Sequence, residues 1–378
     1  MKKHSDGEVK KSKSVVLLPQ DVIMEILLKL NVKSVVRFKS LSKSWLSLIS
    51  DSRFRNLYFD RSSPTEKLLI ISIRVLDLTV PSIDFNAPLN RDSYSYFEFE
   101  VPGEVFQPGI FKFGGCCRGF VLLDCLEHLC LWNPRTGFHK KVCRPPIDSN
   151  KELSRNLLFQ GLGYDPLTDD YLVIQLFASI TIYLQTHAKV FSIRANKWME
   201  NESTDLFFTY SQDYDTPCRV VNHVIHWLSS CLKEEIIVGF ILAFDVAKRK
   251  FFEIASPIVF GDGMDEMRVL SEIEGLLSLN VYTNSKLSID IWVMKEYRVE
   301  CSWSKSIAVS LVDHVPQKFF FPVCVTKDGD IVGNDLCGLF KFNNKGQLKE
   351  MLSYQDVSAH LHVEMYQESF LSLPCPND

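Results

Sequence analysis

The sequence lacks any long hydrophobic run, and this absence sets the first limit on the class of protein. The longest apolar stretch covers residues 236–244, which suits one strand and is far shorter than the ~20 residues of a membrane-spanning helix. Only residues 15–18 are uniformly apolar ahead of Pro19, and such a run is too short for the core of a signal peptide. We therefore expect a soluble, intracellular protein, in the cytoplasm, the nucleus or both, with no membrane partner.

Paired cysteine motifs are also missing. The chain has 11 cysteines, an odd number without regular spacing, and at 378 residues it does not need a disulfide framework. We interpret them as reduced thiols in the core. One group is dense enough that a zinc site is an alternative to reduced core thiols. It consists of Cys116, Cys117, Cys125, His128 and Cys130. This group contains no C-x-x-C pair, and residues 119–132 alternate like paired strands, so we expect no metal.

No strong charge of either sign is present. The formal net charge of -4 provides no overall attraction to nucleic acid, and we expect no nucleic-acid partner. Five lysines lie within residues 1–13, which we interpret as a basic, flexible tail rather than an import signal. With 46% hydrophobic and 23% charged residues, the composition is ordinary for a folded chain.

Catalytic motifs are absent as well, since the sequence contains no G-x-S-x-G, no Gly-rich phosphate loop and no H-E-x-x-H. His223 and His226 lie in an alternating strand pattern that places them on opposite faces of a sheet. Asp328, Asp330 and Asp335 lack the full ligand set of a calcium loop. We therefore expect a non-catalytic protein without a cofactor, and an enzyme remains the third of three hypotheses.

The chain does contain a dense helical pattern at residues 17–59. Pro19 suits the first turn of a helix, because its missing N–H costs nothing there. A helix is predicted over residues 19–30, with its apolar positions on one stripe. That stripe consists of Val22, Ile23, Ile26, Leu27 and Leu30.

Two further helices are predicted behind the first. Asn31 can cap a second helix, in which the apolar positions are Val35, Phe38, Leu41, Trp45, Leu48 and Ile49. Asp51 can cap a third helix, in which they are Phe54, Leu57 and Tyr58. Three short helices make a poor independent core, so the leftover apolar face predicts a partner protein. The alternative is an ordinary helical hairpin that packs on its own domain.

Residues 17–59 resemble an F-box in its plant form. The matching positions include Leu18, Pro19, Asp21, Glu25, Ile26, Leu27, Leu30, Lys33, Ser34, Arg37, Phe38, Lys43, Trp45, Leu48, Ile49, Asp51 and Phe54. The resemblance implies binding of the Skp adaptor and, through it, of a cullin–RING ubiquitin ligase. The adaptor-binding surface that it implies consists of Leu18, Pro19, Ile23, Ile26, Leu27 and Leu30.

Four positions depart from the F-box pattern. Asn31 and Ser52 stand where prolines are usual, and Ser40 and Ser42 where cysteines are usual. Asn31 remains a good helix cap, whereas a serine hydroxyl in a packed face needs a hydrogen-bond partner. These departures leave open how tightly the adaptor binds, without abolishing the fold.

After residue 60 the pattern changes to short strands broken by Gly, Asn, Asp and Pro. One composite recurs: an aromatic-bearing strand, a polar turn and a second strand. Its equivalent aromatic residues are Trp132, Phe191, Phe244, Trp292 and Phe340, spaced by 59, 53, 48 and 48 residues. A period near fifty is that of a kelch-type propeller blade, and each unit has room for four strands.

We predict a mainly β fold, with a three-helix F-box at residues 14–60 and a kelch-like β-propeller of about six blades at residues 61–378. Five units are visible in the pattern. We expect residues 65–115 to furnish a sixth unit, or the strand that closes the ring against the carboxyl terminus.

Residues 110–350 resemble the plant F-box-associated interaction domain, which is related to kelch repeats and occurs in S-locus and legume F-box proteins. The resemblance rests on motifs in the same order, at residues 114–123, 131–137, 161–174, 190–201, 223–230, 241–254 and 290–309. It implies a substrate-recognition subunit of a Skp–cullin–F-box ubiquitin ligase, whose propeller binds a protein substrate of unknown identity. The alternative is a propeller binding module whose degenerate F-box engages no ligase.

Most residues in these motifs are predicted to be structural. The tryptophans expected in the blade core are Trp132, Trp198, Trp227, Trp292 and Trp303. The pairs Asn133-Pro134 and Asp165-Pro166 are expected to form turns.

Substrate contacts are expected on loops at one face of the propeller, where irregular insertions gather. The candidate stretches are residues 141–156, 201–219 and 257–268. The second carries Phe207, Phe208, Tyr210 and Tyr214 among acidic residues. That composition suits a protein partner, and it equally suits a poorly packed loop.

Overall fold

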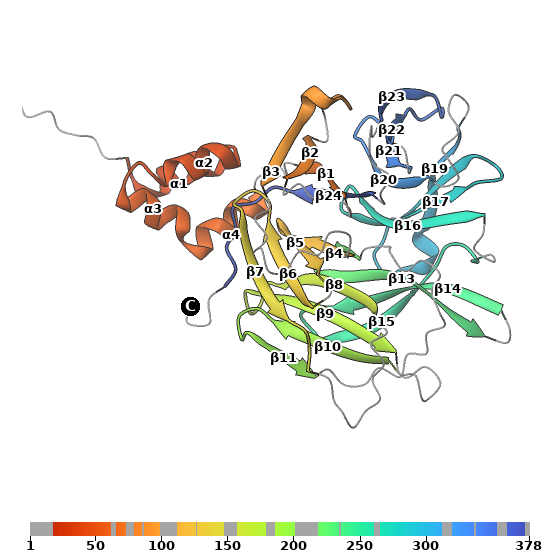
Figure 1. Cartoon of the computed structure of the whole chain (residues 1–378), viewed down its shortest axis with the longest axis horizontal. Helices are drawn as coiled ribbons and strands as arrows, with labels where there is room; N and C mark the ends of the chain where they lie inside the picture. The colour runs from red at the N-terminus through yellow and green to blue at the C-terminus, as the bar shows by residue number, and fades with distance from the viewer. Residues whose placement is uncertain are drawn as a thin grey trace, which may run out of the picture. The chain divides into compact units, whose positions relative to one another are not determined.

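The chain divides into two units, Met1–Ser63 and Pro64–Asp378, each with its own core (Figure 1). The computed structural model describes residues 18–61, 66–72, 79–84, 87–98, 112–125, 127–146, 157–178, 186–200, 218–233, 236–260, 265–311, 320–335, 338–353 and 361–374. Within these ranges, no helix has the length and apolar character that crossing a membrane requires.

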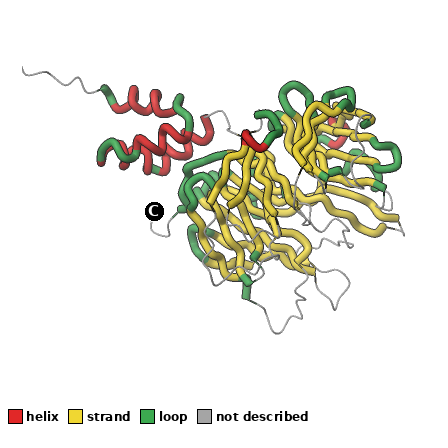
Figure 2. Tube along the Cα trace, turned by 45° about the horizontal axis from the view of Figure 1, so that its top comes forward, coloured by secondary structure: helices red, strands yellow, loops and turns green. Residues whose placement is uncertain are grey.

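The first unit consists of short helices, drawn in red in Figure 2. They are α1 (Gln20–Leu28), α2 (Val32–Phe38), α3 (Lys43–Ser50) and α4 (Ser52–Arg61). Their shared core contains Leu27, Val35, Ile49 and Phe54, each at most 1% exposed. The core is therefore built from one or two side chains per helix, as expected for so short a segment.

Side-chain caps define where these helices begin. The side-chain oxygens of Asn31, Ser42 and Asp51 accept hydrogen bonds from the backbone N–H groups of Ser34, Trp45 and Phe54, at 2.9, 3.2 and 3.1 Å. The prediction of caps at Asn31 and Asp51 is confirmed. The prediction of one helix from Asn31 to Ile49 is wrong, because Ser42 has an extended backbone and starts a separate helix. The described part of this unit therefore has four helices, not three.

The second unit is a β-propeller of six four-stranded antiparallel sheets, and we number these blades 1 to 6 (Figure 1). From the axis outward, blade 1 has β24 (Leu361–Gln367), β1 (Glu66–Ser72), β2 (Thr79–Asp84) and β3 (Tyr94–Glu98). Blade 2 has β4 (Lys112–Cys117), β5 (Phe120–Asp124), β6 (His128–Asn133) and β7 (Phe138–Cys143). Blade 3 has β8 (Leu157–Asp165), β9 (Asp170–Ala178), β10 (Thr186–Ser192) and β11 (Lys197–Glu200).

The other three blades follow the same order along the chain. Blade 4 has β12 (Arg219–Val221), β13 (Val224–Lys233), β14 (Ile236–Asp245) and β15 (Lys250–Ala255). Blade 5 has β16 (Glu266–Ile273), β17 (Leu276–Thr283), β18 (Ser288–Met294) and β19 (Trp303–Ser310). Blade 6 has β20 (Phe321–Val325), β21 (Ile331–Asn334), β22 (Gly338–Phe342) and β23 (Leu348–Ser353).

Blade 1 joins the two ends of this unit. Residues 66–98 supply its outer three strands, and the C-terminal strand β24 supplies the innermost one. β24 pairs with β1 in one continuous antiparallel register, from Glu66 opposite Gln367 to Ser72 opposite Leu361. The prediction for residues 65–115 is thus confirmed for residues 66–98, which build three strands of a sixth blade and whose first strand receives the closing strand, whereas Lys112–Cys117 belongs to blade 2.

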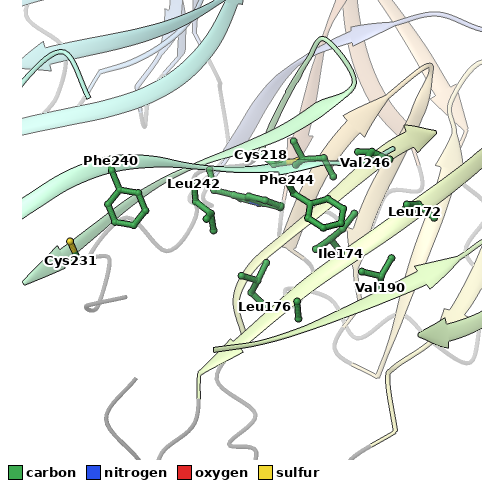
Figure 3. Packing of buried hydrophobic residues seen from close by; sticks show 13 residues of the cluster. Leu172, Ile174, Leu176, Val190, Cys218, Cys231, Phe240, Leu242, Phe244 and Val246 are labelled. Carbon is green, nitrogen blue, oxygen red and sulfur yellow. The ribbon is translucent and has the colours of Figure 1, made fainter. Parts of the chain in front are cut away.

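The recurring aromatic residue occupies the same strand in five blades. Trp132, Phe191, Phe244, Trp292 and Phe340 all lie on the third strand, so the predicted equivalence is confirmed. Three of them lie in core clusters shared with the preceding blade: Trp132 with Leu69 of blade 1, Phe340 with Tyr282 of blade 5, and Phe244 with Ile174 and Val190 of blade 3 (Figure 3). The period of about fifty residues therefore reflects one third-strand aromatic in each of five blades.

Indole N–H groups tie neighbouring blades together at three places. Those of Trp198, Trp227 and Trp303 donate to carbonyl oxygens of the preceding blade, on Cys143, Gln160 and Ala255, at 2.8, 2.7 and 3.1 Å. Of the five tryptophans predicted to be core, Trp132 and Trp227 are buried, and Trp198, Trp292 and Trp303 are half-buried.

Candidate functional site

The helical unit leaves an apolar stripe of α1 uncovered. Leu18, Val22 and Ile26 follow one another at four-residue intervals and are 52%, 41% and 44% exposed. Val22 and Ile26 are four residues apart on α1 and lie on the same face of the helix, and Leu18 precedes the start of the helix by two residues. We call these three residues the α1 stripe. An uncovered apolar row on a unit with so small a core is a candidate protein-binding surface.

The residues predicted for this surface divide by burial. Leu18, Pro19 and Ile26 are exposed, and Ile23 and Leu30 are half-buried. Leu27 is 0% exposed and belongs to the core of the helical unit, so its side chain is not on the surface. The predicted set did not include Val22, although its spacing from Leu18 and Ile26 places it on the same row.

Contacts below and beside α1 hold the stripe in place. The hydroxyl of Tyr58 on α4 donates to the carbonyl oxygen of Leu30, just past the end of α1. Arg61 forms an ion pair with Glu25 at 3.3 Å, but both side chains are largely exposed, which makes this contact weak. These contacts hold α1 against α4, so the exposed side chains of α1 keep one orientation on the helical unit.

The two serines that replace cysteines both have hydrogen-bond partners. The Ser40 hydroxyl donates to the carbonyl oxygen of Arg37 at 2.7 Å. The Ser42 hydroxyl caps α3 and lies 2.9 Å from the hydroxyl of Ser44. The departures from the F-box pattern therefore leave no unpaired hydroxyl at these two positions.

A second pair of uncovered apolar residues lies further along the unit. Leu41, between α2 and α3, is 61% exposed, and Leu46 on α3 is 47% exposed. Nearby, burial and the neighbouring Arg55 guanidinium lower the pKa of Lys39. The surface of this unit therefore combines uncovered leucines with several cationic side chains.

Of the candidate substrate loops on the propeller, only parts are described. Phe207, Phe208, Tyr210 and Tyr214 lie outside the described residues, as do residues 147–156. Residues 256–260 are described, and Val259 there is 81% exposed. The next residue, Phe260, is buried against Gly239, where an added Cβ would lie 2.1 Å from its ring, and the Arg268 guanidinium lies 4.5 Å above that ring. Phe260 therefore anchors the loop that presents Val259.

Three of the residues weighed for catalysis, His226, Asp330 and Asp335, have structural partners. His223 is exposed in a turn, whereas His226 is buried, with its ring nitrogens 3.2 Å from the Arg219 carbonyl oxygen and 2.8 Å from the Tyr297 hydroxyl. Asp330 accepts a hydrogen bond from the Lys349 ammonium at 2.7 Å. Asp335 accepts one from the backbone N–H of Gly338.

The cysteine group considered for zinc is largely buried. Burial raises the pKa of Cys117 and Cys130 to about 12 and that of Cys125 to about 11, so these thiols stay protonated at neutral pH. Within the described ranges, no three His, Cys, Asp or Glu residues gather as metal ligands. Burial also lowers the pKa of His128, assisted by the nearby charges of Lys141 and Arg144.

Comparison with known families agrees with this division of the chain. Residues 16–57 match the F-box domain, and residues 73–340 match the F-box associated beta propeller domain. The chain belongs to the F-box-associated β-propeller family. It is a plant-type F-box protein, with its F-box in the helical unit and its associated domain in the propeller.

Two relatives from Arabidopsis thaliana illustrate the extent of the match. An F-box/kelch-repeat protein is 27% identical over 306 residues, which cover 79% of this chain and 81% of the relative. The F-box protein CPR1 is 27% identical over 385 residues, which cover 96% of this chain and 90% of the relative. The similarity to CPR1 therefore spans both units of this F-box protein.

Solved structures resemble the propeller only distantly. A periplasmic gluconolactonase of Pseudomonas aeruginosa is 8% identical with a TM-score of 0.42, covering 80% of this chain and 99% of that one. An α-L-arabinofuranosidase of Lactobacillus brevis is 12% identical with a TM-score of 0.37, covering 70% and 94%. At these scores the similarities carry no argument about function.

Proposed function

We propose that this F-box protein is the substrate-recognition subunit of a Skp–cullin–F-box ubiquitin ligase. In this proposal the α1 stripe binds the Skp adaptor, and the propeller binds the protein substrate. The observation that carries the proposal is the stripe itself, with Leu18, Val22 and Ile26 each more than 40% exposed on an F-box. Pro19 and the half-buried Ile23 and Leu30 border this row and complete the contact surface.

Physical chemistry supports a partner for this row. Burying one such aliphatic side chain stabilises a complex by roughly 1.5–3 kcal/mol, and the stripe offers two of them one turn apart on α1 and a third, Leu18, just before the helix. Leu27 contributes indirectly, because it packs in the core beneath the exposed residues. Its role in the proposal is to hold the helix, and not to contact the adaptor.

The propeller needs no catalytic group in this proposal. A ligase receptor works by holding its substrate close to a ubiquitin carrier that docks elsewhere. The proximity of substrate and carrier accelerates the transfer of ubiquitin. Exposed residues that a rigid scaffold presents, such as Val259 beside its anchored neighbour Phe260, have the character of substrate contacts. Phe207, Phe208, Tyr210 and Tyr214 stay proposed contacts from composition alone.

The test is binding of a purified plant Skp adaptor to the full chain by titration calorimetry. We expect the wild type to bind and the Val22→Asp/Ile26→Asp variant to lose on the order of 100-fold in affinity, because two charges would be buried without partners. The matched control is Ser52→Asp, which adds an acid to the exposed start of α4 and leaves the stripe intact.

Two outcomes contradict the proposal. One is equal binding by wild type and the stripe variant, which would place the adaptor on another surface. The other is no binding by a folded wild type, which would leave a propeller binding module with a degenerate F-box. Circular dichroism of each variant shows whether the helices are intact. Leu27 is kept unchanged, because a charge in that buried position would unfold the unit.

A further inference from the structure

An ion pair crosses the centre of the propeller. The guanidinium of Arg219, on the innermost strand of blade 4, binds the carboxylate of Glu364, on the innermost strand of blade 1. Blades 1 and 4 are three places apart in a ring of six, so they lie opposite each other and the pair spans the axis. Only 12% of the Arg219 side chain and 2% of the Glu364 side chain are exposed.

Further contacts fill the axis around this pair. Arg219 also donates through Nε to the carbonyl oxygen of Leu270 on blade 5, at 2.7 Å. The Cys218 thiol donates to the carbonyl oxygen of Gly114 on blade 2, at 3.3 Å. At Gly115, where φ is +125°, an added Cβ would lie 2.4 Å from the Cys218 sulfur. Side chains of Cys218, Arg219 and Glu364 thus occupy the space between the innermost strands, where backbone carbonyl oxygens of blades 2 and 5 accept hydrogen bonds from the first two.

Glu364 belongs to the strand that closes the ring, and side-chain contacts hold the residues after that strand. The amide of Asn133 on blade 2 donates to the carbonyl oxygens of Ser369 and Leu371, at 3.2 and 3.3 Å. The Ser369 hydroxyl donates to the carbonyl oxygen of Arg118, at 2.9 Å. We call residues 361–374 the closing strap.

Backbone pairing alone does not choose the register of the strap. A shift of two residues along β1 keeps the inward and outward faces of β24 and restores an equivalent hydrogen-bond ladder. Such a shift would place His362 or Tyr366 where Glu364 now meets Arg219. Arg219 would then be buried without its carboxylate, which strongly disfavours the shifted pairing.

We propose that the Arg219–Glu364 pair selects the register in which the C-terminal strand closes the ring. Polar pairs buried among apolar residues specify register in other assemblies at some cost in stability. The arrangement here has the same logic, because Glu364 on the closing strand has one matching cation across the axis, and just after the strand Glu368 forms an ion pair with Lys67 on β1 in the same register. Arg219 and Glu364 are therefore positioning residues for the closure of the propeller.

The test measures register directly by cross-linking in the full chain. Leu68 on β1 is opposite Met365 in the structure, so Leu68→Cys/Met365→Cys reports the native register. Leu68→Cys/Val363→Cys and Leu68→Cys/Gln367→Cys report shifts of two residues in the two directions. Each cysteine pair is introduced into the wild type, into Glu364→Gln and into Arg219→Met/Glu364→Met, and disulfides are quantified by mass spectrometry of peptides.

We expect only the native cross-link in the wild type. In the doubly substituted variant we expect the melting temperature to stay near that of the wild type, while a shifted cross-link rises at least tenfold relative to the native one. Replacing a buried ion pair by apolar residues often preserves stability, so a purely stabilising role would leave the cross-link ratio unchanged. An unchanged ratio in that variant overturns the proposal. If the variant does not fold, the same ratio in Glu364→Gln decides.

Discussion

At the scale of single residues, His226 shows how burial gives a histidine a structural role. Its imidazole lies between Arg219 and Tyr297 and is 0% exposed. Burial lowers its pKa to about 4, and hydrogen bonds to the backbone of Arg219 and Val224 only partly oppose this effect. The sequence presented this histidine as a candidate catalytic group, but its buried and neutral state makes it a structural one.

The depressed pKa of His226 predicts an acid-sensitive propeller. Above pH 6.5 the imidazole is neutral in the folded and unfolded states, so its contribution to the free energy of unfolding is fully present. As the pH falls from 6.5 towards 4, the unfolded chain binds a proton that the folded one excludes, and about 3 kcal/mol of stability is lost. Urea titrations at several pH values measure how steeply the free energy of unfolding falls with pH. His226→Gln should reduce this pH dependence, and an unchanged pH dependence would mean that other groups cause it.

Gln175 allows a second prediction at this scale. It is 0% exposed, and neither atom of its amide has a hydrogen-bond partner within the described ranges. A buried amide without partners destabilises a fold by about 1–3 kcal/mol. We expect Gln175→Met, which keeps the volume, to raise the melting temperature in calorimetry, with Gln347→Met on the exposed surface as the control. A lowered melting temperature would mean that ordered water satisfies the amide.

At the scale of elements, the helical unit shows what spacing alone misses. The apolar residues from Val35 to Ile49 keep helical spacing, so the sequence favours one helix. The structure breaks it after Phe38 and restarts it at Lys43, because Ser42 caps the backbone of Trp45. The signal in the sequence was a serine three residues ahead of a tryptophan, and it is too common to outweigh the periodicity.

Because α3 begins at this break, the contribution of the Ser42 cap to stability can be measured. We expect Ser42→Ala to lower the stability of the helical unit by about 1 kcal/mol, because the N–H of Trp45 loses its acceptor, and Ser42→Asp to retain it. Thermal unfolding followed by helical circular dichroism measures both. Ser40→Ala is the control, since the Ser40 hydroxyl donates to Arg37 and caps no helix start. Equal losses at both positions would contradict a capping role.

The blades show which patterns a sequence reveals best. In blades 2, 3, 4 and 6 a short turn joins the third and fourth strands, so Trp132, Phe191, Phe244 and Phe340 each lie within a local, repeated hairpin, whereas residues 295–302 separate β18 from β19 after Trp292. Blade 1 lacks this signature, because its third strand, β2, carries no aromatic residue, and its innermost strand begins at Leu361, far from the other three at residues 66–98. No local pattern connects such distant segments, so the sequence left its role open between two possibilities.

At the scale of the whole molecule, closure depends on the last described strand. Deleting residues 361–378 would remove the innermost strand of blade 1 and leave Arg219 buried without its carboxylate. We expect the propeller to lose its cooperative unfolding transition in calorimetry, while the helical unit, with its own core, retains its helical signal. A truncated chain that still unfolds in one sharp propeller transition would contradict this dependence.

The pairing of β24 with β1 also determines when the molecule can be completed during its synthesis. The ribosome makes the outer three strands of blade 1 before those of every other blade, and β24 after all of them. Until then the inner edge of β1 has no neighbour, and an unpaired edge invites association with other chains. The helical unit, made earlier still, needs no such wait. Under the proposed function, an adaptor that binds during translation would therefore meet a folded F-box while the propeller is still open.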